Sequence, residues 1–297
     1  MKMLLLLHLA PIIMAASTRT LAVPTPKDVE ASNMVLTPAG LRHVSTVHEV
    51  PLGGSIRHIS NSTIHILDAT HTIVKVVNID PTVTPTSDAV VPAASGWIAY
   101  AYFFNAGAAI GSFKTTWTVP PPPSVVNSQS IFLFNAIQPV SDGVIMQPVL
   151  QWGQSAAGGG NSWNIASWFV SPGGTFFTTL IGVSPGQSIQ GQVQLVGANS
   201  DNTRFSYLSS FTNQPATELR IDDVDQLRLA TVALEAYGIT QSGNYPSGST
   251  TFSGINLELS TGQFPDIVWG TLNDNTDGIS VNVGTQGSTS ASITISY

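Results

Sequence analysis

From Gly96 onward the chain is a succession of short β-prone runs separated by turns rich in glycine and proline. Many short strands at such spacing are typical of an antiparallel sandwich or barrel. Only residues 215–229 resemble a helix, and we expect little of that window to be helical. We predict an all-β fold, an antiparallel β-sandwich over residues 96–297, preceded by an N-terminal prosegment. The predicted strands are Trp97–Phe104, Ser112–Val119, Ile131–Ile137, Val144–Gly153, Trp163–Val170, Thr175–Val183, Ser188–Val196, Phe205–Phe211, Leu229–Tyr237, Thr250–Leu259 and Ser290–Tyr297.

The first 95 residues divide into two parts. Residues 1–16 have a charged start, a run of leucines and a small-residue end, as in a secretory signal peptide. We therefore expect a secreted, extracellular protein without a membrane anchor. Residues 17–95 are predicted to be a prosegment and linker: 23–52 weakly structured, 53–80 with three short strands, and 80–95 a Pro-rich linker. Asn61 begins an N-glycosylation sequon, which in a secreted protein marks an exposed turn.

The run Val144–Gly153 carries two glutamines on one face. Side chains alternate along a strand, so Gln147 and Gln151 project to the same side. Pro148 has no N–H, which predicts an edge strand or a bulge. A half-exposed strand with a polar outer face is the simplest interpretation of this run by itself.

The absence of cysteine, and of histidine after position 71, excludes several common catalytic mechanisms. The chain has no cysteine, and its six histidines all lie at or before position 71. Residues 90–297 therefore cannot form a Ser-His-Asp triad, a Cys-His pair or a His-ligated zinc site. We expect no metal and no cofactor. The same residues carry four basic and eleven acidic side chains, so we expect no nucleic-acid partner.

Carboxylates, amides and hydroxyls remain as candidate catalytic groups in residues 90–297. No compact acidic cluster suits a glycosidase, which needs two facing carboxylates, and we interpret residues 222–225 as a solvated loop rather than a calcium site. Glu235 stands alone in an apolar run, on the same face as Thr231 and Tyr237. A lone glutamate there is costly unless it is solvated, paired or functional. An exposed outer face would also explain it.

The residues Trp97, Gly111–Phe113 and Trp117–Pro120 resemble the N-terminal strand pair of the glutamic peptidases (eqolisins), secreted acid proteases of fungi. Val144–Gln147 is similar to the strand that carries that family's catalytic glutamine. Residues 168–169 and 183–189 resemble its next strand and glycine turn. Residues 230–237 resemble the strand of its catalytic glutamate, and Glu235 falls on that residue. The resemblance spans residues 96–259 and implies a concanavalin A-like jelly roll, a signal peptide and a prosegment.

This sequence departs from the family around the two catalytic positions. Phe134 stands where the family has a tryptophan, and Ser167 and Gln151 stand where it has acidic residues. Thr231 stands where the family often has another glutamate, and Pro148 directly follows the glutamine. The resemblance therefore implies a divergent member with an altered site, in which Phe134, Gln151, Ser167 and Trp168 contact substrate.

The mechanism that the resemblance implies uses two side chains. Glu235 would take a proton from the attacking water and then donate it to the leaving amine. The Gln147 amide would stabilise the oxyanion. The partners would be polypeptide substrates, and the protein would be a monomer.

Two other interpretations stay open: a catalytically inactive homologue and a carbohydrate-binding, lectin-like sandwich. A lectin would use exposed aromatics, for which Trp152, Trp163 and Trp168 are candidates, although aromatics in strands are more often core. The five histidines after the signal peptide all lie in residues 17–95. We predict that this segment masks the site and responds to pH; a permanent strand layer over residues 55–77 is the alternative.

Overall fold

The computed structural model describes residues 33–79, 96–139 and 143–297. These residues form strands and two short 3₁₀ helices, η1 (Val44–Thr46) and η2 (Ser242–Asn244), with no α-helix among them. Within the described ranges no helix is long and apolar enough to cross a membrane. The predicted signal peptide and the linker over residues 80–95 lie outside the described residues.

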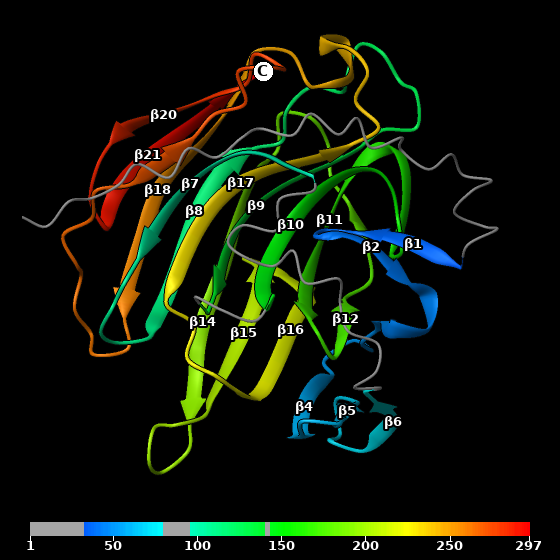
Figure 1. The fold of residues 1–297 in the computed structure, drawn as a ribbon, viewed down its shortest axis with the longest axis vertical. Coiled ribbons are helices and arrows are strands. Elements are labelled where there is room, and N and C mark those ends of the chain that lie inside the picture. The colour runs from blue at the N-terminus through cyan, green and yellow to red at the C-terminus, as the bar shows by residue number, and fades with distance from the viewer. Residues whose placement is uncertain (1–32, 80–95, 140–142) are drawn as a thin grey trace, which may run out of the picture.

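Two large sheets and one separate hairpin contain the strands (Figure 1). The hairpin consists of β1 (Met34–Thr37) and β2 (Gly40–His43). The nine-stranded sheet has, in spatial order, β19 (Gly270–Leu272), β7 (Trp97–Phe104), β17 (Leu229–Tyr237), β9 (Ser130–Gln138), β10 (Ile145–Ser155), β11 (Gly158–Ser171), β12 (Gly174–Phe177) and β3 (Val47–Glu49), and β13 (Ile181–Gly182) also pairs with β11. The ten-stranded sheet has β20 (Ser280–Thr285), β21 (Thr289–Ser296), β18 (Ser249–Leu259), β8 (Ile110–Thr118), β14 (Ser188–Ala198), β15 (Phe205–Phe211), β16 (Gln214–Val224), β4 (Ser55–Ser60), β5 (Thr63–Leu67) and β6 (Ile73–Asn78).

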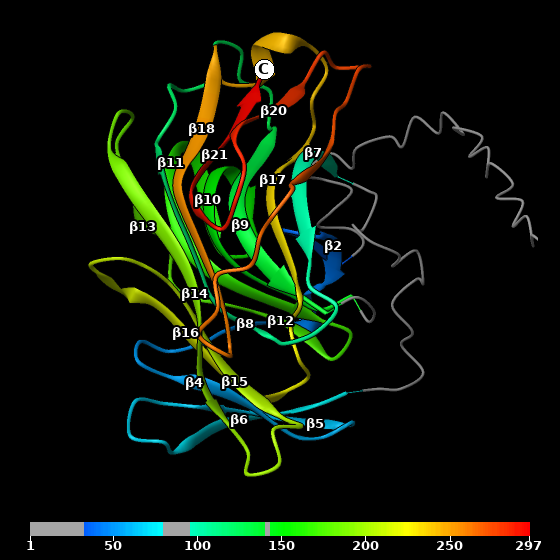
Figure 2. The ribbon, with the colours of Figure 1, turned by 90° about the vertical axis from the view of Figure 1, so that its left-hand side faces the viewer.

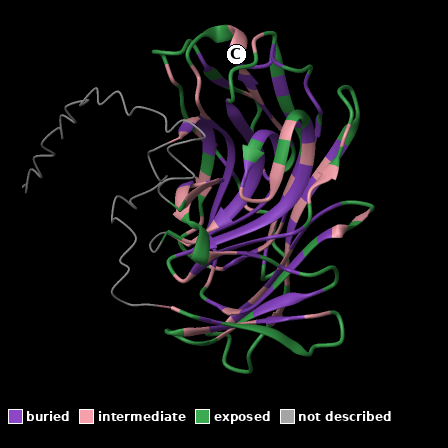
Figure 3. Cartoon of the chain, turned by 90° about the vertical axis from the view of Figure 1, so that its right-hand side faces the viewer, coloured by how far each residue is buried: buried purple, intermediate pink, exposed green. Residues whose placement is uncertain are grey.

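The two sheets pack face to face, which confirms the predicted β-sandwich. Their inner faces share one apolar cluster, to which β8 contributes Phe113 and Trp117 and β9 contributes Leu133, all buried. Figure 3 shows the strands largely buried while the connecting turns are exposed. Alternation along each strand therefore sends one set of side chains into this core and the other set to the outer face of its sheet.

The N-terminal residues extend both sheets, which the sequence did not predict. β3 pairs in parallel with β12, and β4 pairs in parallel with β16. Figure 2 shows β4, β5 and β6 continuing the ten-stranded sheet beyond β15 and β16. The three strands predicted within residues 53–80 are confirmed, whereas the prediction of weak structure over residues 23–52 is wrong for residues 33–49. Those strands are short: β3 takes its hydrogen-bonding partner from β12 of the sandwich, whereas β1 and β2 pair with each other.

Pro148 lies in the interior of a sheet, so of the two predicted alternatives, an edge strand or a bulge, the edge strand is wrong. β10 runs between β9 and β11. The ladder to β9 pairs Met146 with Ile137 and Val149 with Phe134, and it has no pair at Gln147 or Pro148. The sheet thus tolerates the missing N–H through a local gap in pairing, and a register shift follows between Trp152 and Gly153 on the β11 side.

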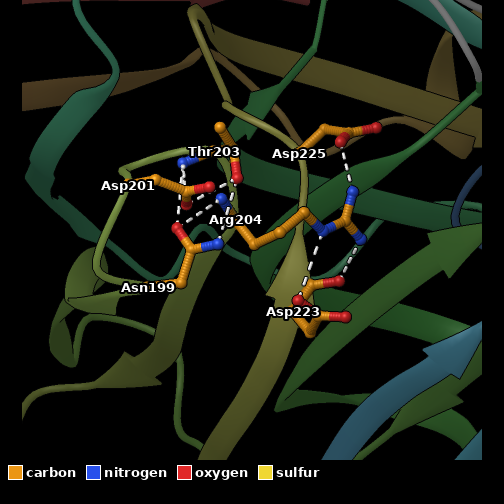
Figure 4. Close-up of polar contacts among 6 residues, drawn as sticks. All are labelled: Asn199, Asp201, Thr203, Arg204, Asp223 and Asp225. Atoms are coloured by element: carbon orange, nitrogen blue, oxygen red, sulfur yellow. Dashed lines mark hydrogen bonds and ion pairs between the residues drawn. The ribbon is translucent and has the colours of Figure 1, made fainter.

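Arginines neutralise the acidic run at the end of β16. Asp222 pairs with Arg57 and Arg220, and the guanidinium of Arg204 contacts Asp223 and Asp225 (Figure 4). Asn199 accepts hydrogen bonds from the backbone N–H groups of residues 203 and 204, which holds the turn that carries Arg204. Among the described residues, no group of three or more acidic or histidine side chains could hold a metal ion.

Gly191 marks a close approach of the two sheets and allows a stability prediction. A Cβ at this position of β14 would lie 2.8 Å from Cγ of Pro148 and 2.8 Å from the Trp117 ring. We expect Gly191→Ala to lower the free energy of unfolding by about 1–3 kcal/mol, the usual cost of overpacking. Gly160→Ala is the control, because a Cβ there meets nothing within 4 Å. Urea unfolding of both variants checks this; equal midpoints would contradict it.

Candidate functional site

The outer face of the nine-stranded sheet, turned away from the ten-stranded sheet, carries a second apolar cluster. Part of the N-terminal segment packs on this cluster through Leu36, Ala39 and Val47. Figure 1 shows β1 and β2 lying across β10 and β11, and the N–H of Ala156 donates to the carbonyl of Leu36 at 2.7 Å. The buried members of the cluster are Trp97, Tyr100, Phe132, Phe134, Ala136, Ile145, Val149, Ala166, Trp168, Val170, Phe177 and Ala233.

Gln147 and Glu235 both face this outer cluster. Gln147 lies between Ile145 and Val149 in the alternation of β10, and both of these neighbours belong to the outer cluster. Glu235 alternates in the same way with Ala233, while Leu234 points into the core between the sheets. Both side chains are fully buried. Glu235 is thus covered on the outer face and does not lie between the sheets.

The strand register separates the two residues along the sheet. Thr231 pairs with Ala136 and Glu235 pairs with Phe132, and Phe132 pairs in turn with Gln151. Across the sheet, Glu235 on β17 therefore lies directly opposite Gln151 on β10, with β9 between them. Thr231 lies opposite Gln147 in the same way, and we call such residues level with each other. Two strand spacings and four residues along the strand put the Cα atoms of Gln147 and Glu235 roughly 16 Å apart.

The carboxyl of Glu235 is held by the N-terminal hairpin and by its own strand. Ala39 N–H donates to Oε1 at 2.6 Å, and the Tyr237 hydroxyl donates to the same oxygen. Oε2 is buried without a hydrogen-bond partner among the described residues. One oxygen is thus used to hold the hairpin, and the other stays available for a proton.

Burial raises the pKa of Glu235 to about 7, because the charged form loses its hydration; the hydrogen bonds from Tyr237 and Ala39 oppose this shift. The half-buried Arg42 of β2 lies within electrostatic reach of Glu235. Burial lowers the pKa of this arginine, and Tyr237 and Glu235 oppose that change. The hairpin therefore brings both a hydrogen-bond donor and a positive charge to the glutamate.

A second group of buried polar atoms lies level with Gln147. Neither amide atom of Gln147 has a hydrogen-bond partner among the described residues, and the same holds for Thr231 Oγ1 and Trp168 Nε1. Trp168 pairs directly with Gln147 across β10 and β11. Buried polar groups are normally satisfied, so this row is able to bind a ligand that supplies both donors and acceptors, as a peptide group does.

The other predicted substrate contacts divide between two faces. Phe134 lies on the outer face, with its ring 5.5 Å from that of Trp97. Gln151 also lies there, but its amide donates to the carbonyls of Gly153 and Gly158 and so shapes the turn between β10 and β11. Ser167 accepts a hydrogen bond from Ser209 of the facing sheet. Its place between the sheets corrects the prediction that it contacts substrate, since alternation turns it inward.

The turn between β1 and β2 carries backbone strain at the contact with Glu235. Ala39 has φ of 96°, in the region that favours glycine. Thr37 Oγ1 donates to the carbonyl of Gly40 across the turn at 2.8 Å. Strained residues of this kind persist where the surroundings determine the conformation. The turn is therefore held in the conformation that aims the Ala39 N–H at the carboxyl.

Sequence reasoning missed the residues that surround Glu235. Tyr237 was placed on the same face but given no role, and the hairpin residues Ala39 and Arg42 were not considered. The Thr37–Gly40 stretch, Thr-Pro-Ala-Gly, is a turn signal between two short apolar runs. It could have predicted a hairpin, although not its contact with a residue 196 positions later.

The aromatic residues considered for a lectin are buried. Trp152 and Trp163 belong to the core between the sheets. Trp168 is fully buried on the outer face, with its ring tilted against that of Phe177 at a centroid distance of 4.9 Å. None of the three offers an exposed ring for a sugar. Asn61 is exposed, in the turn between β4 and β5, which is where the sequon predicted a turn.

Comparison with known proteins gives low similarity throughout. No family model matches the chain, and no curated protein matches it. A crystal structure of Scytalido-glutamic peptidase with a peptide-based transition state analog has a TM-score of 0.43 at 18% identity, and the match covers 69% of this chain and 98% of that one. SCP-B, a member of the eqolisin family of peptidases in complex with the tripeptide Ala-Ile-His, has a TM-score of 0.41 at 15% identity with the same coverage. The β-porphyranase BpGH16B from the human gut bacterium Bacteroides plebeius has a TM-score of 0.20 at 8% identity, covering 47% and 65% of the two chains.

Proposed function

We propose that this chain is the precursor of a secreted acid endopeptidase in which Glu235 and Gln147 act on a peptide bond. The observation that carries the proposal is the contact at Glu235, whose Oε1 accepts a hydrogen bond from the Ala39 N–H at 2.6 Å. A peptide group of the chain itself lies against this buried carboxyl. Once the N-terminal segment leaves, a peptide group of a substrate could take the same place.

Departure of the segment would also change the chemistry of the glutamate. Burial raises the pKa of Glu235 to about 7, and water that returns to an open site would lower this pKa towards its ordinary value of about 4.3. Glu235 would then be a carboxylate at mildly acidic pH and could act as a base. In the closed form the same group is covered and, below pH 7, mostly protonated, which suits an inactive precursor.

The proposed reaction needs one water molecule. The Glu235 carboxylate takes a proton from the water as its oxygen bonds to the peptide carbonyl carbon. The Gln147 amide N–H stabilises the resulting oxyanion. Glu235 then gives the proton to the peptide nitrogen as the C–N bond breaks, which regenerates the carboxylate. Because the register puts the Cα atoms of the two residues roughly 16 Å apart, one peptide group contacts both only if each side chain extends along the sheet towards the other. The proposed reaction therefore requires both side chains to change rotamer when the site opens.

The test is proteolysis by the full-length protein after incubation at acid pH. We expect cleavage of an unfolded protein at pH 3–5, unaffected by inhibitors of serine, cysteine and metal-dependent proteases. Gln147→Ala should lower kcat/KM by about 100- to 1,000-fold, the usual loss for one oxyanion donor. Gln263→Ala, at an exposed loop position, is the matched control and should behave as wild type. Absence of cleavage at every pH from 3 to 7 would contradict the proposal.

One observation favours a second candidate, a peptide-binding protein that does not hydrolyse its ligand. The residue level with Gln147 across the sheet is Thr231, which cannot act as a general base at acid pH as a carboxylate does. In that case the acid-treated protein would bind peptides on the outer face and leave them intact. Direct binding measurements beside the cleavage assay separate the two candidates.

A further inference from the structure

The outer face continues beyond the part that residues 33–49 cover. On β7 and the neighbouring β19, three large apolar side chains are exposed: Tyr102 and Phe104 by 42% each, and Leu272 by 45%. We call these three residues the aromatic strip. Exposed apolar side chains that gather on one face often mark a binding site.

The aromatic strip belongs to the same face as Glu235. Tyr100 and Tyr102 alternate along β7 and their ring centroids lie 6.0 Å apart. The Tyr100 ring contacts Trp97 at 5.4 Å, and Trp97 contacts Phe134 at 5.5 Å. A continuous row of rings therefore leads from the buried centre of the outer cluster to the exposed strip.

The rings of the strip are held in place by their neighbours. A Cβ on Gly270 would lie 2.6 Å from the Tyr102 ring, so this ring lies directly on the glycine of β19. The guanidinium of Arg228 lies 5.6 Å from the centre of the Phe104 ring, and its Nη1 donates to the carbonyl of Ala106. A binding surface of this kind loses little side-chain entropy when a ligand arrives.

The register sets the distance from the strip to the proposed site. Tyr102 pairs with Thr231, which is level with Gln147. Tyr102 and Gln147 are thus three strands apart, roughly 14 Å, the length of about four residues of extended peptide. A substrate that crosses the strands at Gln147 would bring a side chain about four residues away over the strip.

We propose that the aromatic strip binds an apolar or aromatic side chain of the polypeptide substrate, about four residues from the bond that is cleaved. The proposal rests on the function proposed above for the outer face. Polypeptide is the occupant because the strip continues the surface on which the chain's own Leu36 and Ala39 pack. The strip is then a specificity-determining subsite that the described residues of the segment, 33–79, do not cover.

Two matched peptides test the subsite. They share one sequence around the cleaved bond and differ in carrying Phe or Ser four residues away from it, on either side. We expect the acid-incubated full-length protein to prefer the Phe peptide by about tenfold or more in kcat/KM, since the strip removes the Phe side chain from water. Tyr102→Ala and Leu272→Ser should each reduce that preference. Val268→Ser removes an apolar side chain that is 79% exposed outside the strip, and it should leave the preference unchanged.

Binding to the Glu235→Gln variant distinguishes failure of this proposal from failure of the proposed function. Tighter binding of the Phe peptide that Tyr102→Ala abolishes supports the strip, whether or not the wild type cleaves either peptide. Equal affinity for both peptides, or a preference that survives both strip substitutions, would overturn it. Cleavage without any preference would also reject the strip while supporting the peptidase.

Discussion

Replacing Glu235 with glutamine should abolish acid proteolysis, lowering kcat/KM by about 100- to 10,000-fold, because the amide cannot take a proton from water or return it to the leaving amine. Gln keeps an acceptor oxygen for the Ala39 N–H and the Tyr237 hydroxyl, so the fold and the closed hairpin should survive. Glu218→Gln is the control, since Glu218 is exposed on β16 of the other sheet. Cleavage by Glu235→Gln at the wild-type rate would rule out the role proposed for this carboxyl.

The same substitution should change how closure depends on pH. In the closed form the pKa of Glu235 is raised to about 7. Because its pKa is raised in the closed form, protonated Glu235 stabilises the closed hairpin most strongly below about pH 4.3, its ordinary pKa. This stabilisation is lost as the pH rises through 7. Glu235→Gln cannot ionise, so we expect its hairpin to stay closed above pH 7 where the wild type loosens. Limited proteolysis of residues 33–49 across pH 6–9 measures this difference.

The second prediction concerns the turn that covers Glu235, and it compares two substitutions of Ala39. Ala39→Pro removes the N–H donor and fixes φ near −65°, against the observed 96°. We expect the hairpin to leave the outer face and latent activity to appear without acid treatment. Ala39→Gly keeps the donor and removes a strain of about 1 kcal/mol, so it should hold the segment about fivefold more tightly. The rate of acid activation checks both, and equal rates in the three proteins would contradict the role of this turn.

Histidines of the N-terminal segment should drive its release as pH falls. His48 is buried on β3 beside Phe176, with Nδ1 2.9 Å from Lys75 Nζ. Burial lowers the pKa of His48 to about 4, with Lys75 acting in the same direction, and burial lowers the pKa of His58 too. Because its pKa is lowered in the docked form, neutral His48 stabilises docking of the segment above pH 6.5. This stabilisation is lost as the pH falls towards 4 and the histidine takes up a proton. His48 alone should shift the docked-to-released ratio at least about tenfold over that range.

Glu235 opposes the histidines between pH 4.5 and 7, because its raised pKa favours the closed form there. The Glu235→Gln variant lacks this opposition and should release its segment more steeply as pH falls through 6.5. Mass spectrometry after incubation across pH 3 to 7 follows the loss of residues 33–79. A protein that keeps these residues at every pH, while cleaving substrate, would show that they are a permanent layer of the sandwich.

The sequence predicted much of the fold because alternation and turns are local. β7, β15 and β17 have the predicted bounds, and the face shared by Glu235 and Tyr237 follows from a period of two. β16 was missed although its centre alternates as a half-buried strand does, with Leu219 and Ile221 buried and Glu218 and Arg220 exposed. The inward place of Ser167 was missed as well, although it lies one residue from the outward Trp168. Matching Ser167 to a family position by residue type does not show which face of the sheet its side chain occupies.

By itself, the sequence determined the all-β class, the lack of histidine and cysteine chemistry in residues 96–297, and the facing of Gln147 and Glu235. Those properties depend on composition and on neighbours within one strand. Only the tertiary structure decided that Glu235 is level with Gln151 and Thr231 with Gln147, because register across three strands depends on pairing between residues far apart in the chain. The structure also decided that Ala39, 196 positions before Glu235, covers its carboxyl. Burial of the carboxyl raises the pKa of the glutamate, and the hydrogen bond from the distant Ala39, which no local pattern encodes, opposes that rise while it covers the site.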